Sequence, residues 1–325
     1  MFPMLISVII PVYNDAAWLE RAVASVLVQD VSDMEIILVD NNSTDGSLAL
    51  CHELRIRHPD RIVVGTAARQ GSAAARNEGL RLARGEWVNF LDADDIFLPG
   101  KLSRQLALAR ADTDWVIQAY YDQAMDGKRT LSGLNDDPWK GLVHNGGLGC
   151  TNSHLFRRSL LLKIGGQDES LHNGEDTEMY FRLLKEAPII VADPHPGSVY
   201  VDRVGPRLSR LYVALMLQNG ARLKATVNDW LIENRTAYFY HNRGFFEGAL
   251  LNSIRQVATN DVGKASSLFA EYFPSGIDKE TLRESTVTSL AKSYSLLGFS
   301  RVEHFRVLVT QRIMAPVRKG LKLHS

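Results

Sequence analysis

Short apolar runs alternate with segments of helical periodicity through the first half of the chain. Each run is rich in β-branched residues and apolar at consecutive positions, which is typical of a strand buried on both faces. Each following segment places apolar residues three or four positions apart, which predicts an amphipathic helix. This alternation predicts an α/β fold, in which a mostly parallel sheet is flanked by helices. The predicted strands are 5–11, 35–39, 62–65 and 87–91.

Helix signals follow each of these runs. A cap at residues 14–15 begins the first predicted helix, and a cap among residues 43–45 begins a second one that ends near residue 57. An alanine-rich helix is expected over about 72–83. Pro99 is expected to open a further helix, at the first helical position that proline favours.

The pattern becomes less regular after the fourth strand. Gly, Asn, Asp and Pro accumulate between residues 125 and 149, so we expect a long, mobile connection that contacts substrate. Helical patterns are predicted at 155–164 and from residue 175, and late strands at 189–192 and 198–201.

From about residue 206 onward, consecutive helices replace the strand-helix alternation. This change predicts two domains, residues 1–205 and residues 206–325, and the role of the second is unknown. The predicted breaks between its helices lie near Asn228, Asn242, Asn260, Pro274 and Gly298.

Composition supports an ordinary globular protein. The 325 residues are 45% hydrophobic and 23% charged, and 37 basic residues balance 37 acidic ones, so neither disorder nor nucleic-acid binding is favoured. Cys51 and Cys150 form no C-x-x-C pair, which suits a reducing cytoplasm and argues against a structural zinc. No apolar run approaches the ~18 residues of a membrane span, and residues 5–13 are interpreted as a strand rather than a signal peptide.

Acidic residues lie where two of the predicted strands end. Asp40 follows the second strand, and the Asp92-Ala93-Asp94-Asp95 turn follows the fourth. Open α/β sheets bind ligands at this edge. Two carboxylates two positions apart can bind different groups. One can contact a ribose hydroxyl, and the other can bind a divalent cation that neutralises a diphosphate. An isolated D-x-D can equally be a solvated acidic loop.

The acidic turn is one of several motifs that occur in a fixed order. They are SVIIPVYN at 7–14, VDNNSTDGS at 39–47, ARNEG at 75–79, LDADD at 91–95, GGQDE at 165–169 and GEDTE at 174–178. Together they resemble the family 2 glycosyltransferases of the GT-A fold, over about residues 5–205. The tail from 206 lies outside the resemblance.

The resemblance implies a role for the residues around the nucleotide. Asp40 would contact the base, Asp92 the ribose, and Asp94 would bind Mn²⁺ or Mg²⁺, whereas Asp95 is expected to cap the next helix. Alternatives remain open, because Asp40 can also cap a helix. The other residues implied at the nucleotide are Pro11, Tyr13, Asn14, Arg76 and Arg203.

Two of these assignments depend on local sequence. Arg76 matches a motif position, and the alternative is an ordinary exposed helix arginine. Arg203 lies in a stretch similar to the family's loop over the diphosphate, but Gly205 and Pro206 replace the usual His-Pro-Gly order.

An acceptor hydroxyl must lose a proton as it attacks, so a base is required. The resemblance implies that Asp176 is this base, and that Glu175 contacts the acceptor or orients the loop. Both residues could instead only complement the dipole of the helix that they begin. A single displacement would invert the anomeric configuration.

These observations favour an inverting, metal-dependent glycosyltransferase that uses a nucleotide-diphosphate sugar. Family frequency favours a UDP-sugar, and the expected acceptor is a glycan or a lipid-linked sugar in bacterial surface polysaccharide synthesis. A nucleotidyltransferase or a dinucleotide oxidoreductase would need a Gly-rich loop after the first strand, which is absent. A catalytically silent protein that binds sugar nucleotides or glycans is the alternative from another class.

The C-terminal 25 residues are basic. One predicted helical stripe contains the apolar residues Val302, Phe305, Val309 and Ile313. These 25 residues include six basic residues, and Glu303 is their only acidic residue. One hypothesis is that residues 300–325 contact the inner face of the cytoplasmic membrane, which would place a cytoplasmic enzyme beside a lipid-linked acceptor. The alternative is that the stripe packs in the domain core.

Overall fold

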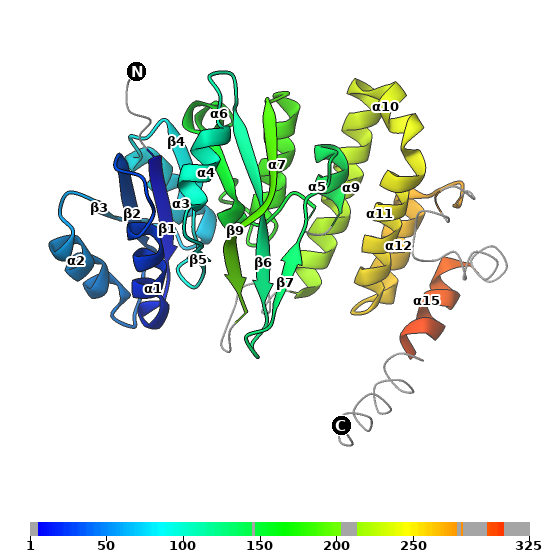
Figure 1. Ribbon diagram of the computed structural model, residues 1–325. Coiled ribbons are helices and arrows are strands. Elements are labelled where there is room, and N and C mark those ends of the chain that lie inside the picture. The colour runs from blue at the N-terminus through cyan, green and yellow to red at the C-terminus, as the bar shows by residue number, and fades with distance from the viewer. Residues whose placement is uncertain (1–5, 145–146, 203–212, 278–280, 282–297, 309–325) are drawn as a thin grey trace. The chain divides into compact units, whose positions relative to one another are not determined.

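The computed structural model divides into two compact units, Met1–Pro206 and Arg207–Ser325 (Figure 1). The first is an α/β unit and the second is helical. The assignment of the first unit to catalysis stays a prediction. The residues that the structure describes are 6–144, 147–202, 213–277, 281 and 298–308.

One nine-stranded sheet forms the centre of the first unit within these residues. The strands are β1 (Ile6–Val12), β2 (Met34–Asp40), β3 (Ile62–Thr66), β4 (Trp87–Phe90), β5 (Ile96–Phe97), β6 (Trp115–Gln123), β7 (Arg129–Ser132), β8 (His154–Arg157) and β9 (Ile190–Val201).

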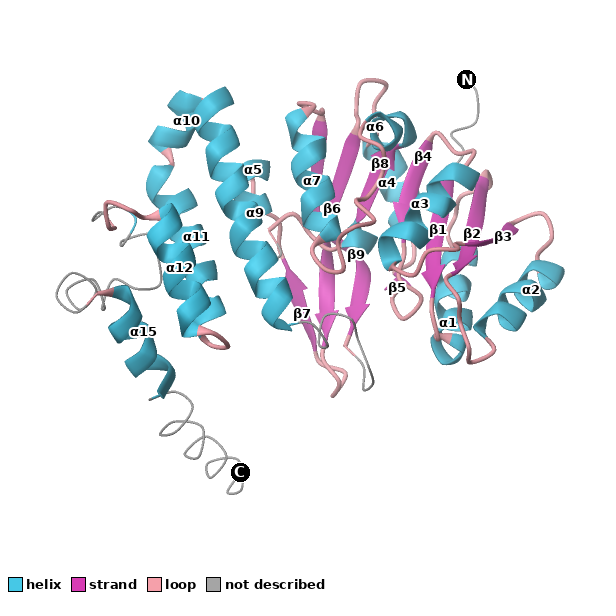
Figure 2. Ribbon diagram, turned by 180° about the vertical axis from the view of Figure 1, so that it is seen from behind, coloured by secondary structure: helices cyan, strands magenta, loops and turns pink. Residues whose placement is uncertain are grey.

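The sheet is parallel in one half and mixed in the other. The order is β3-β2-β1-β4-β8-β6-β9-β5, and β7 pairs with β6 (Figure 2). Neighbours among β3, β2, β1 and β4 are parallel, as the apolar runs predicted. Beyond β4 only the β6 and β9 pairing is parallel, because β8 enters antiparallel between β4 and β6. The predicted α/β sheet flanked by helices is confirmed, although the sheet as a whole is mixed and most of its parallel pairs lie in the first half.

Helices cover both faces of the sheet in the first unit. They are α1 (Ala16–Leu27), α2 (Ser47–Arg57), α3 (Ser72–Leu82), α4 (Lys101–Leu108), α5 (Pro138–Val143), the 3-10 helix η1 (Thr151–Ser153), α6 (Arg158–Lys163) and α7 (Glu175–Lys185).

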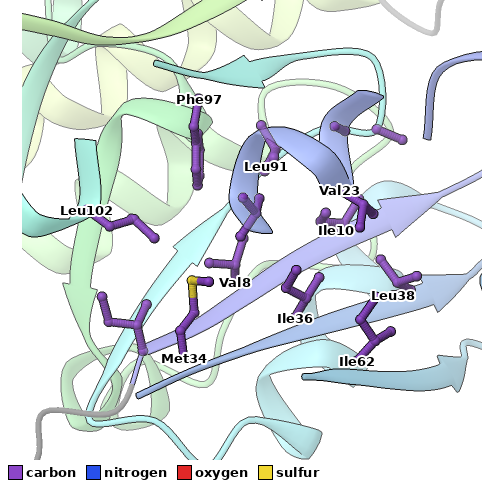
Figure 3. Packing of buried hydrophobic residues seen from close by; sticks show 14 of the residues in the cluster. Val8, Ile10, Val23, Met34, Ile36, Leu38, Ile62, Leu91, Phe97 and Leu102 are labelled. Atoms are coloured by element: carbon purple, nitrogen blue, oxygen red, sulfur yellow. The ribbon is translucent and has the colours of Figure 1, made fainter. Parts of the chain in front are cut away.

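A cluster of buried hydrophobic residues lies on one face of the parallel half. Val8 and Ile10 of β1 and Ile36 and Leu38 of β2 point to the same side, where Val23 of α1 packs against them (Figure 3). Alternate residues of a strand point to opposite faces, so the residues between them face the other side.

α3 covers that other face at close range. A Cβ added at Gly79 would lie 2.3 Å from Ile9 Cγ2, so glycine is needed for α3 to approach β1 this closely. This packing brings Arg76, one turn earlier on α3, to the edge of the sheet where β1, β2 and β4 end.

Several predicted boundaries are wrong. Residues 125–149 contain β7 and α5 rather than an irregular connection only, and 155–164 begins as strand β8 before α6. The helix expected to open at Pro99 begins at Lys101, because Gly100 adopts a left-handed conformation that starts the turn. In the same way Gly46, with φ of 93°, takes the capping position of α2 that the sequence assigned to residues 43–45.

The second unit packs as a set of helices. Its core includes Leu251, Ile254 and Leu268, together with Phe299 and Val302 from the C-terminal helix. The break predicted near Asn228 is wrong, because this residue is buried within a continuous helix. The breaks near Asn242 and Asn260 are confirmed. The described helices are α9 (Val213–Asn234), α10 (Thr236–His241), α11 (Arg243–Ala258), α12 (Val262–Tyr272) and α15 (Phe299–Leu308).

The predicted C-terminal stripe is divided by the structure. Val302 is 6% exposed and lies in the core, whereas Phe305 is 70% exposed. Glu303 is fully buried, and its carboxylate pairs with Arg255 at 3.0 Å and with Arg306 at 2.6 Å. Val309 and Ile313 lie outside the described residues. None of the helices in the described ranges has the length and hydropathy needed to cross a bilayer.

Candidate active site

Asp40 ends β2 as a buried carboxylate with one free oxygen. The residue is 3% exposed, and its Oδ2 accepts a hydrogen bond from the Ser43 amide at 3.3 Å. Oδ1 has no hydrogen-bond partner among the residues that the structure describes. Because an unpaired buried carboxylate oxygen is costly, this atom is suited to accept an N–H from a ligand.

The end of β1 is joined to the turn that follows Asp40. Asn14 Oδ1 accepts a hydrogen bond from the backbone amide of Thr44 at 2.7 Å, and the backbone amide of Asn14 donates to Ser43 Oγ at 3.1 Å. Asn14 itself adopts a positive φ of 54°. Tyr13 is 46% exposed and Pro11 is half-buried beside it. The structure thus brings Pro11, Tyr13 and Asn14 to the strand edge that carries Asp40.

Arg76 lies at the centre of the carboxylate cluster. Its side chain is 4% exposed, and one guanidinium nitrogen contacts Asp92 Oδ1 at 2.6 Å. The other lies 3.3 Å from Asp176 Oδ1 and 3.8 Å from Glu175 Oε1. Burial alone lowers the pKa of Arg76, but the charges of Asp176, Asp92 and Glu175 outweigh this effect and raise it. The interpretation of Arg76 as an ordinary exposed helix residue is therefore wrong.

Asp176 lies in the first turn of α7 and accepts hydrogen bonds on both carboxylate oxygens. Thr151 Oγ1 donates to Oδ2 at 2.5 Å, and Gln167 Nε2 donates to Oδ1 at 2.6 Å. Glu175 instead accepts from Ser72 Oγ at 2.5 Å. The Asp176 side chain is 30% exposed and that of Glu175 is 12% exposed, so Asp176 is the more accessible of the pair.

Asp92 and Asp94 lie together in the turn after β4. Burial raises the pKa of Asp92, Arg76 opposes this rise, and Asp94 and Asp176 add to it. The described residues hold no group of three or more side chains that could form a complete metal cage. The donor set nevertheless fits Mg²⁺ or Mn²⁺, because such ions commonly bind one or two carboxylates and take their other oxygens from phosphates and water.

Asp95 does not cap the helix that follows it. It is 1% exposed, and its carboxylate accepts from Asn152 Nδ2 at 2.8 Å and from the Val201 amide at 2.8 Å. The prediction of a cap is wrong because α4 begins only at Lys101. Asp95 instead connects the turn after β4 to η1 and to the end of β9.

Sequence reasoning missed Thr151 and Gln167. Thr151 lies just after the stretch that was expected to be irregular, and Gln167 lies inside a recognised motif without a role of its own. Their contacts with Asp176 depend on the arrangement of η1, the 165–174 loop and α7, which no local pattern reports. Arg203 lies outside the described residues.

Comparisons with known proteins identify the fold and the family. Residues 7–165 match the sequence profile described as "Glycosyl transferase family 2". The N-terminal unit belongs to this family. An uncharacterized glycosyltransferase of Nostoc sp. is 37% identical over 172 residues, which cover 50% of this chain and 53% of that protein. The chain spans about half the length of the first curated relatives that it matches.

Two solved structures resemble the chain along most of its length. S. aureus TarS 1-349, in complex with UDP-GlcNAc, aligns with a TM-score of 0.59 and 19% identity over 89% of this chain and 92% of that one. A mannosyltransferase of Pyrobaculum calidifontis, in complex with GDP-Man and Mn²⁺, aligns with a TM-score of 0.56 and 20% identity over 95% of this chain and 87% of that one. The predicted GT-A fold, with a helical C-terminal region, is confirmed.

Proposed function

We propose that the chain is an inverting, metal-dependent glycosyltransferase that moves a sugar from a nucleotide-diphosphate sugar to a hydroxyl acceptor. The observation that carries this proposal is the position of Arg76, whose one guanidinium contacts both Asp92 and Asp176. A donor-side carboxylate and a candidate base therefore lie within the span of a single side chain. A sugar donor and an acceptor hydroxyl can meet between them.

The base end of the donor would bind at Asp40. Its buried Oδ1 can accept the imide N–H of uracil or an N–H of guanine. Pro11, Tyr13 and Asn14 would line the same pocket. A UDP-sugar remains our proposal by family frequency, and the complexes of the two structural relatives with UDP-GlcNAc and GDP-Man make both nucleotides worth testing.

The phosphate end would lie at the turn after β4. Asp92, held by Arg76, would accept from a ribose hydroxyl, and Asp94 would hold the divalent cation. When bound, that cation would neutralise the charge that develops on the leaving diphosphate. Arg203 remains a proposed contact to the diphosphate.

Asp176 would take the proton of the acceptor hydroxyl as that oxygen attacks the anomeric carbon. The Gln167 and Thr151 hydrogen bonds hold the carboxylate in one orientation, and its partial exposure leaves room for an acceptor. Attack from the face opposite the diphosphate inverts the anomeric configuration. Glu175, bound to Ser72, would orient the start of α7 or contact the acceptor.

The acceptor that we propose is a glycan or a lipid-linked sugar of a bacterial surface polysaccharide. We also propose that the protein works in the cytoplasm, with its C-terminal residues at the membrane. Burial of Val302 limits this membrane contact to exposed Phe305 and the basic residues beyond Leu308.

A panel of UDP- and GDP-sugars, incubated with and without Mn²⁺, tests the proposal by release of the nucleoside diphosphate. We expect Mn²⁺-dependent release from one donor and its loss in Asp94→Ala, since that change removes a charged oxygen ligand. Glu53→Gln, which alters an exposed salt bridge to Arg57 within α2, is the control. Binding without release, by wild type, would favour the silent binding protein.

A further inference from the structure

Helix α1 contacts the turn that carries Asp94. The Arg21 guanidinium donates a hydrogen bond to the Asp94 backbone carbonyl at 2.6 Å. The same guanidinium lies 5.2 Å from the ring centre of Trp18, one turn earlier on the helix. A charged donor to a carbonyl is stronger than a neutral one, and stacking on an aromatic ring limits the positions of the guanidinium. Arg21 therefore restrains the backbone at Asp94.

Two further side chains on the same side of α1 continue this contact. Residues 21, 25 and 29 are four positions apart, so they follow one face of the helix and its C-terminal turn. Ser25 Oγ accepts from the Phe97 amide at 3.1 Å. Gln29 donates to the Leu98 carbonyl at 2.9 Å and accepts from the Leu102 amide at 3.2 Å.

The beginning of α1 is fixed to the turn on the nucleobase side. The Asp15 amide donates to Ser47 Oγ at 2.9 Å, and the Ala16 amide donates to Asp45 Oδ2 at 3.1 Å. Burial alone raises the pKa of Asp45, but hydrogen bonds from Ser47 and Ala16 outweigh it and lower the pKa. A charged Asp45 thus holds the first turn of α1 against the loop that follows Asp40.

The segment from β5 to α4 is also held by contacts that do not involve Arg21. Phe97 and Leu102 are buried in the core cluster (Figure 3), and Ile96 pairs with Val199 of β9. Asp95 holds the turn from its other side through Asn152 and Val201. Arg21 is exposed and restrains only the carbonyl of the residue whose carboxylate would bind the cation.

We propose that α1 is a rigid spacer between the nucleobase turn and the metal turn, and that Arg21 is the positioning residue for Asp94. The inference rests on the proposed function. In this arrangement one helix sets the distance between the base-binding Asp40 and the cation-binding Asp94. That distance must match a nucleoside diphosphate, so α1 would determine how well the cation and the diphosphate bind together.

The test compares nucleotide binding with and without metal. Isothermal titration gives the affinity of wild type for UDP and for GDP, in EDTA and in Mn²⁺, and the tighter of the two nucleotides is then used for the variants. Removing a residue that orients a metal ligand typically costs about 10- to 100-fold in metal affinity. We expect Arg21→Ala to raise the Mn²⁺ concentration that gives half-maximal enhancement of nucleotide binding by about tenfold, the lower end of that range.

The EDTA affinity of Arg21→Ala should equal that of wild type, because the base and ribose contacts remain. Arg21→Lys keeps a cationic donor and should restore part of the Mn²⁺ enhancement. Glu20→Gln, on the same helix, removes only the charge that pairs with Arg57 at 2.7 Å and should behave as wild type.

Three outcomes would overturn the inference. An unchanged Mn²⁺ dependence in Arg21→Ala removes its positioning role, and the proposed function then still stands. An equal loss of affinity in EDTA and in Mn²⁺ would mean that Arg21 only stabilises the fold. Failure of wild type to bind either nucleotide more tightly with Mn²⁺ contradicts the proposed function and this inference together.

Discussion

Replacing Arg76 by methionine removes the cation that joins three carboxylates. The stem of methionine fills much of the same space, so the main loss is the buried charge. Removing one partner of a buried ion pair typically costs about 3–5 kcal/mol, because the other partner stays buried without compensation. The carboxylates here are only partly buried, with side-chain exposures of 33% for Asp92, 30% for Asp176 and 12% for Glu175. Since water can solvate these carboxylates in part, we expect Arg76→Met to lower the free energy of unfolding by about 3 kcal/mol, the lower end of that range.

Urea unfolding at pH 7, followed by tryptophan fluorescence, measures this loss. Four of the five tryptophans lie in the first unit, and Trp230 alone lies in the second, so fluorescence reports mainly the unit that contains Arg76. Arg81→Met is the matched control on the same helix, because its side chain is 67% exposed and pairs only with Glu78 in the structure's described part. This control should unfold at the same urea concentration as wild type.

Arg76→Lys refines the same test. A lysine keeps the charge, but its single ammonium cannot match the fork that reaches Asp92 and Asp176 together. Its stability should therefore lie between those of wild type and Arg76→Met. If Arg76→Met is as stable as wild type, or if the lysine variant is the less stable of the two, the carboxylates are not held by Arg76 and the reasoning fails.

Two other predictions concern the helical unit. Burial lowers the pKa of Lys224 to about 8. Below that pH the folded protein must therefore bury a charged amine away from water, which destabilises the fold. At pH 7 the free energy of unfolding of Lys224→Met should exceed that of wild type by up to about 3 kcal/mol, and this difference should shrink as pH rises from 8 toward 10.5. Urea unfolding, followed by circular dichroism, measures the difference. A difference that is constant with pH would contradict the prediction. The 325-residue chain should sediment with phosphatidylglycerol liposomes at low salt. A chain ending at Leu308 keeps Val302 in the core and should stay in the supernatant. Equal sedimentation of both chains would place the contact elsewhere.

The parallel half of the sheet could be predicted from sequence because its strands are buried on both faces. Continuous apolar runs such as 35–39 are too short to form helices, so their pattern predicts strands. Strand β8 could not be distinguished in the same way, because its four residues continue directly into α6 and share one apolar pattern with it. β7 is exposed on nearly all its residues, so it has no hydrophobic pattern to detect.

The candidate site shows a similar limit. Spacing and motif order could indicate Asp92, Asp176 and Arg76, but contacts among residues up to 100 positions apart arise only from the fold. Gly79 illustrates the dependence, since the close approach of α3 to β1 brings Arg76 to the strand edge. Arg21 could not be found from sequence, because its partner is a backbone carbonyl and carries no side-chain signal.

Turnover and donor affinity of Asp176→Asn test the central claim most directly. An asparagine can still accept from Gln167 through its carbonyl oxygen, and its amide can donate to Thr151, so the local structure should persist. We expect unchanged donor affinity in Mn²⁺ and turnover lowered on the order of 10²-fold or more, because a neutral amide cannot take the acceptor proton. Near-normal turnover with unchanged donor affinity would contradict the account, since the proton would then go to a group other than Asp176.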